Sequence, residues 1–182
     1  EVISSLRDKV YYIVLNIKQK YMETAYLAGG CFWCVEAIFQ RVKGVKKLES
    51  GYCNGSNQNP SYESVCSGQT GHAEVVKIDF DESEVSFHNL LEVFVATHDP
   101  TSLNQQGADR GTQYRSAIFY VNDSQKQIAT TMIENIKGAV TEITELDVFY
   151  PAESYHQNYF NDNSNQPYCQ MVILPKINKF FN

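Results

Sequence analysis

The sequence has no apolar run that approaches the roughly 18 residues of a membrane helix. It also has no convincing signal peptide. The apolar stretch 10–17 is short, the polar run 18–20 follows it, and no Ala-x-Ala cleavage pattern comes after. We therefore expect a protein of the cytoplasm that neither spans nor binds a membrane.

Basic residues are also too few and too scattered to form a phosphate-binding stripe. The chain has 15 Lys and Arg against 21 Asp and Glu, a net charge of −6, with the two signs mixed along its length. Nucleic acid is therefore disfavoured as a partner. The five cysteines are an odd number and are sparse for a chain of 182 residues, so a secreted disulfide scaffold is disfavoured too. Reduced thiols, some of them reactive, fit better.

Length and composition favour one folded domain. With 182 residues, 43% of them hydrophobic, the chain can bury a substantial core. Residues 1–21 differ from the rest and are interpreted as an N-terminal extension, for which we predict a single helix. Residues 22–182 are then expected to form a single domain, and we expect a monomer.

Apolar periodicity and turn residues predict alternating strands and helices. Ser86 is expected to cap one of the helices, and a glycine at position 138 to end another. This order predicts an α+β fold, a two-layer sandwich with a ferredoxin-like core, a mixed or antiparallel sheet and long loops. The predicted strands are 24–28, 47–53, 73–80, 116–121, 142–149 and 168–174, and the predicted helices are 34–42, 86–95 and 123–137.

The most distinctive segment is Gly-Gly-Cys-Phe-Trp-Cys, which places Cys31 between a strand and a helix. Unpaired N–H groups and the positive end of the helix dipole stabilise a thiolate at such a position. We therefore expect the pKa of Cys31 to lie below the value of about 8.5 for a free thiol. This context favours a redox nucleophile over a residue that only fills the core.

Three kinds of chemistry compete with simple core packing for this cysteine pair. Cys31 and Cys34 are half of a zinc-ligand pattern, but Cys53 and Cys66 are too far apart to supply the other half. A papain-like protease would pair Cys31 with a distant histidine such as His156, but the Cys-Gly-Ser-Cys-Trp signature is absent. Thiol redox chemistry suits the CxxC spacing, because the second sulfur lies one helical turn away.

The aromatic residues Phe32 and Trp33 between the two cysteines distinguish the motif from that of thioredoxin, which usually has Gly and Pro there. Together with other blocks, the motif resembles the peptide methionine sulfoxide reductases of the A class. The resemblance extends over about residues 24 to 175. The matching blocks are Gly30-Cys31-Phe32-Trp33, Gly51-Tyr52, residues 65–74, His98-Asp99-Pro100 and residues 105–116.

The resemblance implies a reaction, the reduction of the S epimer of methionine sulfoxide to methionine. It implies that Cys31 attacks the sulfoxide sulfur and becomes a sulfenic acid. Phe32 and Trp33 would hold the substrate methyl group in an apolar pocket. The substrates would be oxidised proteins or peptides and free methionine sulfoxide.

The resemblance also implies hydrogen bonding to the sulfoxide oxygen. Glu74 would protonate or hold this oxygen, Tyr52 and Tyr114 would donate to it, and Asp109 would support the network. A carboxylic acid can do this only if burial raises its pKa towards neutrality. From the sequence alone, Glu74 could equally be a solvated acid at a strand edge. No metal and no bound cofactor are expected, with thioredoxin as the external reductant.

Two cysteines are candidates for the thiol that resolves the sulfenic acid. Cys34 is the first choice because it needs no loop movement, and Cys169 in the last predicted strand is the second. Cys53 and Cys66 are expected to be structural. His72 is expected to shape a loop, and a substrate-side role for His156 is left open. The alternative from another class is a metal- or thiol-based binding module without turnover.

Overall fold

The computed structural model describes residues 10–11 and 21–181 of the chain. The helix predicted in the extension 1–21 lies almost wholly outside these residues. None of the described helices has the length and apolar character needed to cross a membrane.

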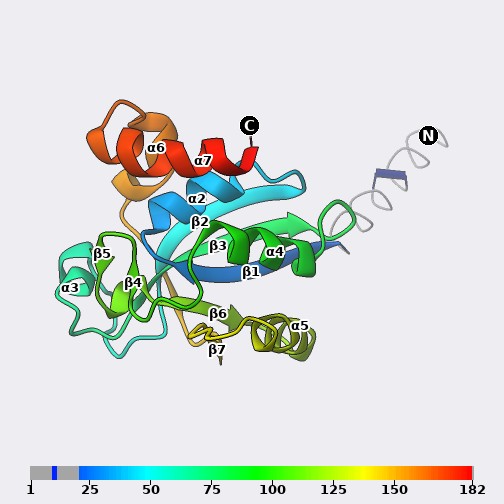
Figure 1. Cartoon of the computed structure of the whole chain (residues 1–182). Helices are drawn as coiled ribbons and strands as arrows, with labels where there is room; N and C mark the ends of the chain where they lie inside the picture. The colour runs from blue at the N-terminus through cyan, green and yellow to red at the C-terminus, as the bar shows by residue number, and fades with distance from the viewer. Residues whose placement is uncertain (1–9, 12–20, 182) are drawn as a thin grey trace, which may run out of the picture.

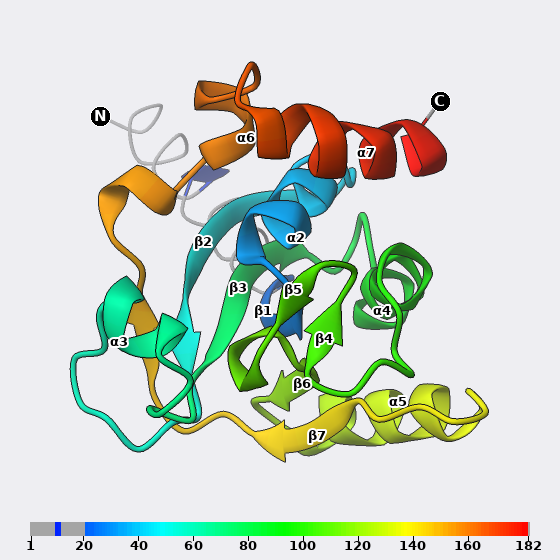
Figure 2. The same cartoon turned by 60° about the vertical axis from the view of Figure 1, so that its left-hand side comes forward.

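A six-stranded mixed sheet forms the centre of the molecule, in the order β7-β6-β1-β3-β2-β8 (Figures 1 and 2). Neighbouring strands are antiparallel except β6 and β7, which are parallel. The predicted α+β fold with a mixed sheet is therefore confirmed. The strands are β1 (Met22–Gly29), β2 (Val45–Cys53), β3 (Ala73–Asp81), β6 (Ser116–Tyr120), β7 (Glu142–Glu145) and β8 (Phe149–Pro151).

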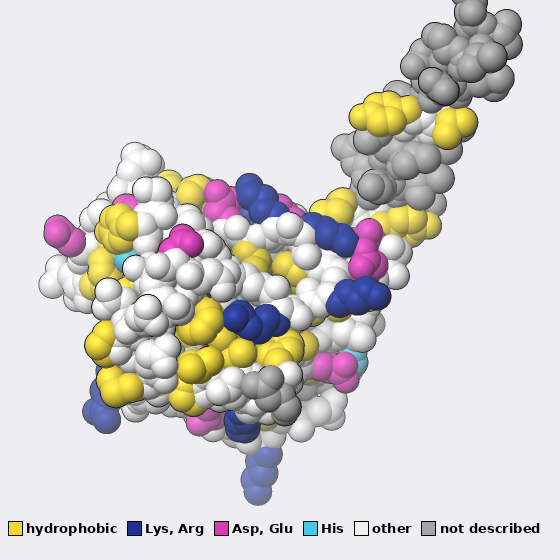
Figure 3. Space-filling model, turned by 90° about the horizontal axis from the view of Figure 1, so that it is seen from above, with side chains coloured by type: hydrophobic (Ala, Val, Ile, Leu, Met, Phe, Trp, Pro, Cys, Tyr) yellow, Lys and Arg dark blue, Asp and Glu magenta, His cyan; other side chains and the backbone are white. Residues whose placement is uncertain are grey.

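Successive residues of a strand point to opposite faces of the sheet, and the helices pack on one of these faces. On β3, Val76 joins the main core with the helices, whereas Val75 joins a smaller cluster on the other face. The C-terminal helix α7 lies over α2 (Figures 1 and 2). The surface seen from above carries a group of hydrophobic side chains with Lys and Arg side chains beside it (Figure 3). The helices are α2 (Phe32–Phe39), α3 (Tyr62–Cys66), α4 (Phe87–Thr97), α5 (Asp123–Glu134), α6 (Tyr159–Asp162) and α7 (Leu174–Phe181).

Local capping explains where several helices begin. The Ser86 side chain accepts a hydrogen bond from the backbone N–H of Asn89, as predicted for the start of α4. The Asn122 side chain does the same for α5, which ends at Glu134, three residues before the predicted end. The predicted strand 142–149 is divided into β7 and β8, which lie at opposite edges of the sheet.

Long connections carry short elements of their own. Helix α3 lies in the segment predicted as loop 57–71, and a small hairpin lies in the loop after α4. The hairpin strands are β4 (Gln105–Gln106) and β5 (Asp109–Arg110), and the single-turn helices are η1 (Thr112–Tyr114) and η2 (Ser154–His156).

The strand predicted at 168–174 is wrong, because this segment is helical. A π-helical turn, η3 (Cys169–Ile173), leads directly into α7. The β-branched run favoured a strand by local propensity, but the buried positions Cys169, Ile173 and Ile177 recur at helical spacing. That stripe contacts α2, so tertiary packing decides the conformation.

Candidate active site

The turn between β1 and α2 places Cys31 at the N-cap of the helix. Gly30 has a positive φ of 90°, and a Cβ there would lie 2.6 Å from Cβ of Gln106. Only glycine fits this close approach without strain. The chain therefore turns sharply and delivers the thiol to the C-terminal end of the central strand β1.

The two thiols of the motif lie together in the core. Cys31 is 8% exposed and Cys34 is 3% exposed. Burial, the Cys34 thiol and the Glu74 carboxyl raise the pKa of Cys31 well above its ordinary value, so the lowering expected from the helix N-terminus is wrong. A hydrogen bond from Cys31 instead lowers the pKa of Cys34 to about 7.

Glu74 is a buried acid next to this pair. It is 1% exposed, and its Oε2 accepts a hydrogen bond of 3.0 Å from the backbone N–H of Phe32. Burial raises the pKa of Glu74 to about 8, and the nearby Asp109 and Cys34 add to this effect. At neutral pH the side chain is therefore mostly a carboxylic acid that can donate a proton.

Aromatic rings enclose the acid and the thiols. Tyr52 is opposite Glu74 in the register of β2 and β3, so both side chains are on the same face of the sheet. The ring centroids of Phe32 lie 5.8 Å from Tyr52 and 6.3 Å from Trp33. Trp33 is also stacked on Tyr159, with centroids 3.7 Å apart and planes inclined by 6°. These rings form an apolar wall beside Cys31.

Asp109 reaches the cysteine pair through a tyrosine that the sequence did not single out. The hydroxyl of Tyr168 donates a hydrogen bond of 2.7 Å to Oδ2 of Asp109 and lies 3.7 Å from Sγ of Cys34. A cleft of about 340 Å³ borders this side of the pair, and Asp109, Tyr168 and Lys176 are among its lining residues.

Tyr114 lies on η1 and faces the same region. Its pKa is raised first by burial and then by the charges of Glu74 and Cys66, and its hydroxyl is a hydrogen-bond partner of Cys66. Tyr62 on α3 is the other partner of this thiol. Cys66, predicted to be structural, is therefore an exposed thiol at the edge of the site.

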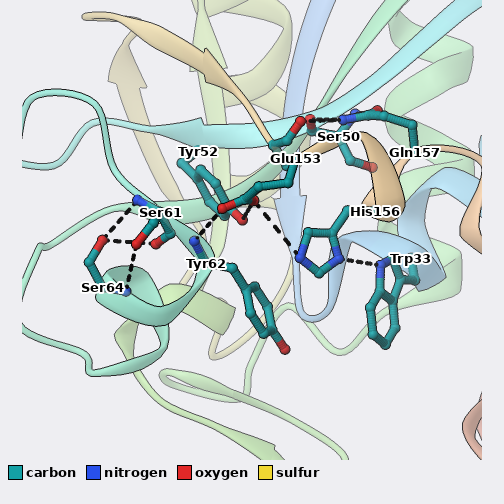
Figure 4. A network of polar contacts seen from close by, with 10 residues as sticks. Trp33, Ser50, Tyr52, Ser61, Tyr62, Ser64, Glu153, His156 and Gln157 are labelled. Carbon is teal, nitrogen blue, oxygen red and sulfur yellow. Dashed lines mark hydrogen bonds and ion pairs between the residues drawn. The ribbon is translucent and has the colours of Figure 1, made fainter.

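A second network supports the wall from the segment that follows β8 (Figure 4). The hydroxyl of Tyr52 donates to Oε2 of Glu153 at 2.9 Å, and Oε1 of Glu153 accepts from the backbone N–H of Tyr62 at 2.8 Å. The indole Nε1–H of Trp33 donates to Nδ1 of His156 at 3.1 Å. A substrate-side role for His156 is left open by the sequence, and no local pattern identifies Glu153 as the partner of Tyr52.

The remaining cysteines and His72 differ in their surroundings. Cys53 is fully buried in the cluster on the opposite face of the sheet. Cys169 is also fully buried, and burial raises its pKa. Nε2 of His72 lies 2.7 Å from the carbonyl oxygen of Asn57, as expected for a residue that shapes the loop. Across the described part of the chain, no three His, Cys, Asp or Glu side chains are grouped so as to hold a metal ion.

Comparisons with known proteins place this geometry in a family. The family model described as "Peptide methionine sulfoxide reductase" matches residues 23–182. The peptide methionine sulfoxide reductase MsrA of Ruthia magnifica is 64% identical over 88% of this chain and 99% of its own length. The enzyme of the same name from Nautilia profundicola is 53% identical over 87% of this chain and 94% of its own length.

Solved structures give the same result. Reduced Mxr1 of Saccharomyces cerevisiae superposes with a TM-score of 0.75 at 32% identity, covering 82% of this chain and 90% of that one. Methionine sulfoxide reductase A of Corynebacterium diphtheriae superposes with a TM-score of 0.74 at 34% identity, covering 79% of this chain and 76% of that one. The structure of Mxr1 in complex with Trx2, at 20% identity and a TM-score of 0.53 over 77% of this chain and 86% of that one, shows similarity of fold alone.

Proposed function

Because the chain belongs to the peptide methionine sulfoxide reductase family, whose reaction returns methionine sulfoxide to methionine, we propose that Cys31 is the nucleophile and Glu74 the acid of this reaction. The observation that carries the proposal is the placement of a buried carboxyl, with a pKa of about 8, next to a buried thiol. A sulfoxide is a poor electrophile until its oxygen is protonated or strongly hydrogen-bonded.

In the first step the sulfur of Cys31 attacks the sulfoxide sulfur while Glu74 gives its proton to the sulfoxide oxygen. Cys34 is placed to take the thiol proton, because Cys31 already donates a hydrogen bond to it. The oxygen passes to Cys31, which is oxidised to a sulfenic acid, and the sulfoxide is reduced by two electrons to a thioether. Glu74 regains its proton from solvent or from Cys34.

Substrate orientation depends on the aromatic wall and the tyrosines. Phe32 and Trp33 receive the methyl group, and Tyr114 donates a hydrogen bond to the oxygen. Tyr52 can join only if its hydroxyl turns from Glu153, to which it donates in the structure. Asp109, bonded to Tyr168, adds negative charge that helps keep Glu74 protonated.

Cys34 is the proposed resolving thiol, ahead of Cys169. Its pKa of about 7 makes thiolate available at neutral pH, and its sulfur is already a hydrogen-bond partner of Cys31. Attack on the sulfenic acid forms the Cys31–Cys34 disulfide and releases the oxygen as water. Cys169 has a raised pKa and is fully buried on η3, so it would have to move.

The setting of the reaction completes the proposal. We expect a dithiol protein of the thioredoxin type to reduce the disulfide, and no bound cofactor. We expect protein-bound and free methionine sulfoxide as substrates, a monomer in the cytoplasm, and catalysis by the single domain 22–182.

The test is turnover of each sulfoxide epimer by the pure protein with dithiothreitol. We expect consumption of the S epimer of N-acetylmethionine sulfoxide and none of the R epimer. Cys31→Ser should abolish turnover, whereas Cys53→Ala should retain it, because Cys53 lies on the opposite face of the sheet. Consumption of R alone, or full activity in Cys31→Ser, would refute the assignment.

A further inference from the structure

One buried histidine at the site has a hydrogen-bonding arrangement that fixes the tautomer of its neutral ring. His156 ends η2 and is 2% exposed, and its ring lies against the rings of Phe32, Trp33 and Tyr62. Trp33 and Tyr62 lie on different sides of it (Figure 4). Its Nδ1 lies 3.1 Å from the indole nitrogen of Trp33. Its Nε2 is buried without a hydrogen-bond partner among the described residues, and Oε2 of Glu153 is 3.9 Å away.

The indole nitrogen dictates which tautomer is present. An indole N–H can only donate, so Nδ1 of His156 must accept and therefore carries no proton. The single proton of the neutral ring is then on Nε2, on the side of Glu153. Protonation of the ring would set an Nδ1–H against the indole N–H, and the hydrogen bond to Trp33 would be lost.

We propose that His156 is a positioning residue: its neutral form holds the indole of Trp33 in place, and its protonation in acid releases the indole and weakens substrate binding. The consequence for binding rests on the proposed role of Trp33 as the wall for the substrate methyl group. The coupling between the two rings does not depend on that role.

The surroundings of the ring agree with a neutral histidine. Burial lowers the pKa of His156 below its ordinary value of 6.5, and the charge of Glu153 opposes this effect. The titratable groups that face the ring are Glu153 and Tyr155 from its own segment and Tyr62 from α3. The residues that face it from α2, Phe32 and Trp33, carry no charge. Both tyrosines remain neutral in acid, so Glu153 and His156 are the groups that can change charge.

Trp33 is the single tryptophan of the chain, so its fluorescence reports this contact directly. We expect the emission of the reduced wild-type protein to change between pH 7 and pH 4 with one transition below pH 6.5. His156→Asn keeps an acceptor near the position of Nδ1 but cannot be protonated, so its emission should lack that transition. Tyr155→Phe is the matched control on the same segment and should keep it.

Steady-state kinetics with the S epimer and dithiothreitol test the effect on binding. Loss of one hydrogen bond corresponds to about fivefold. We therefore expect the KM of the wild type, relative to His156→Asn at the same pH, to rise about fivefold on acidification, with little change in the ratio of kcat values. His156→Phe, which keeps a ring but has no acceptor, should show the raised KM at neutral pH as well.

The outcomes separate this inference from the proposed function. A transition that persists in His156→Asn would assign it to Glu153 and overturn the inference, as would a wild-type emission that does not change with pH. A fluorescence transition that depends on His156 supports the coupling even if neither epimer is consumed, a result that would refute only the proposed function. A KM ratio that is flat with pH would refute the consequence for binding.

Discussion

The buried acid Glu74 should make the protein less stable as the pH rises, and replacing it by glutamine should remove this effect. In the native state Glu74 holds its proton up to a pH of about 8, whereas in the unfolded chain it releases the proton near its ordinary value of 4.5. Between these values the native state binds the additional proton. The free energy of unfolding therefore falls as the pH rises through this interval, and the loss is complete above about pH 8.

The magnitude follows from the gap between the two pKa values of Glu74. Each pKa unit corresponds to about 1.4 kcal/mol, so the interval from 4.5 to about 8 amounts to about 5 kcal/mol in total and to about 3 kcal/mol at pH 7. Solvent screening is small, because Glu74 is only 1% exposed. The total loss is roughly a third or more of the free energy of unfolding of a typical folded domain, which is about 5–15 kcal/mol.

Urea denaturation of the reduced protein from pH 4 to pH 9 measures this difference. Glu74→Gln keeps an acceptor for the backbone N–H of Phe32, so the fold should be retained. The free energy of unfolding of the wild type minus that of Glu74→Gln should fall by about 1.4 kcal/mol per pH unit across the interval. Glu134→Gln, at an exposed position on α5, is the control and should run parallel to the wild type. Parallel curves for Glu74→Gln, or a difference that rises with pH, would refute a buried, protonated Glu74.

Three further outcomes are expected at the same site. The sulfoxide step, measured as methionine formed in a single turnover, should slow as the pH rises through about 8, because Glu74 then loses the proton it donates; a rate that increases through this range would contradict acid catalysis. With thioredoxin as reductant, Cys34→Ser should stop after one turnover, while Cys169→Ser should continue. Mass spectrometry identifies the disulfide that forms, and the reverse pattern would make Cys169 the resolving thiol. Tyr168→Phe removes a hydroxyl 3.7 Å from Sγ of Cys34 that helps lower the pKa of this thiol. It should slow formation of the Cys31–Cys34 disulfide severalfold at pH 7, with one methionine still formed per enzyme. An unaltered disulfide rate would show that the hydroxyl has no such effect.

Much of the fold could be predicted from local signals. Ser86 caps α4 as expected, because a side-chain acceptor before an apolar helical pattern is a local feature. Segment 168–174 is predicted as a strand, whereas contacts with α2, distant in the sequence, make it helical. Local propensity does not contain that contact.

At the site, too, local features could be predicted from the sequence, whereas contacts between distant segments could not. The glycines before Cys31 indicated a turn and a helix N-cap, and the structure has both. The expected lowering of the Cys31 pKa is wrong, because burial, the Cys34 thiol and Glu74 raise it. Neither burial nor a neighbour from another strand can be seen in the motif. The partners Glu153 and His156 come from beyond β8, so only the folded chain identifies them.

The strand order also implies that the two sides of the site differ in how readily they open. Glu74 lies near the start of β3, where it pairs with Tyr52 of β2, and β1 pairs with β3 only from Val76 onwards. The amides of β3 that lie between both long neighbours should exchange with deuterium only on global unfolding. His156 follows β8, a strand of three residues at the sheet edge, and nearby amides can exchange through local opening. Glu74 therefore belongs to a strand anchored between two long neighbours, whereas His156, which bonds the indole of Trp33, follows a short edge strand that should open more readily.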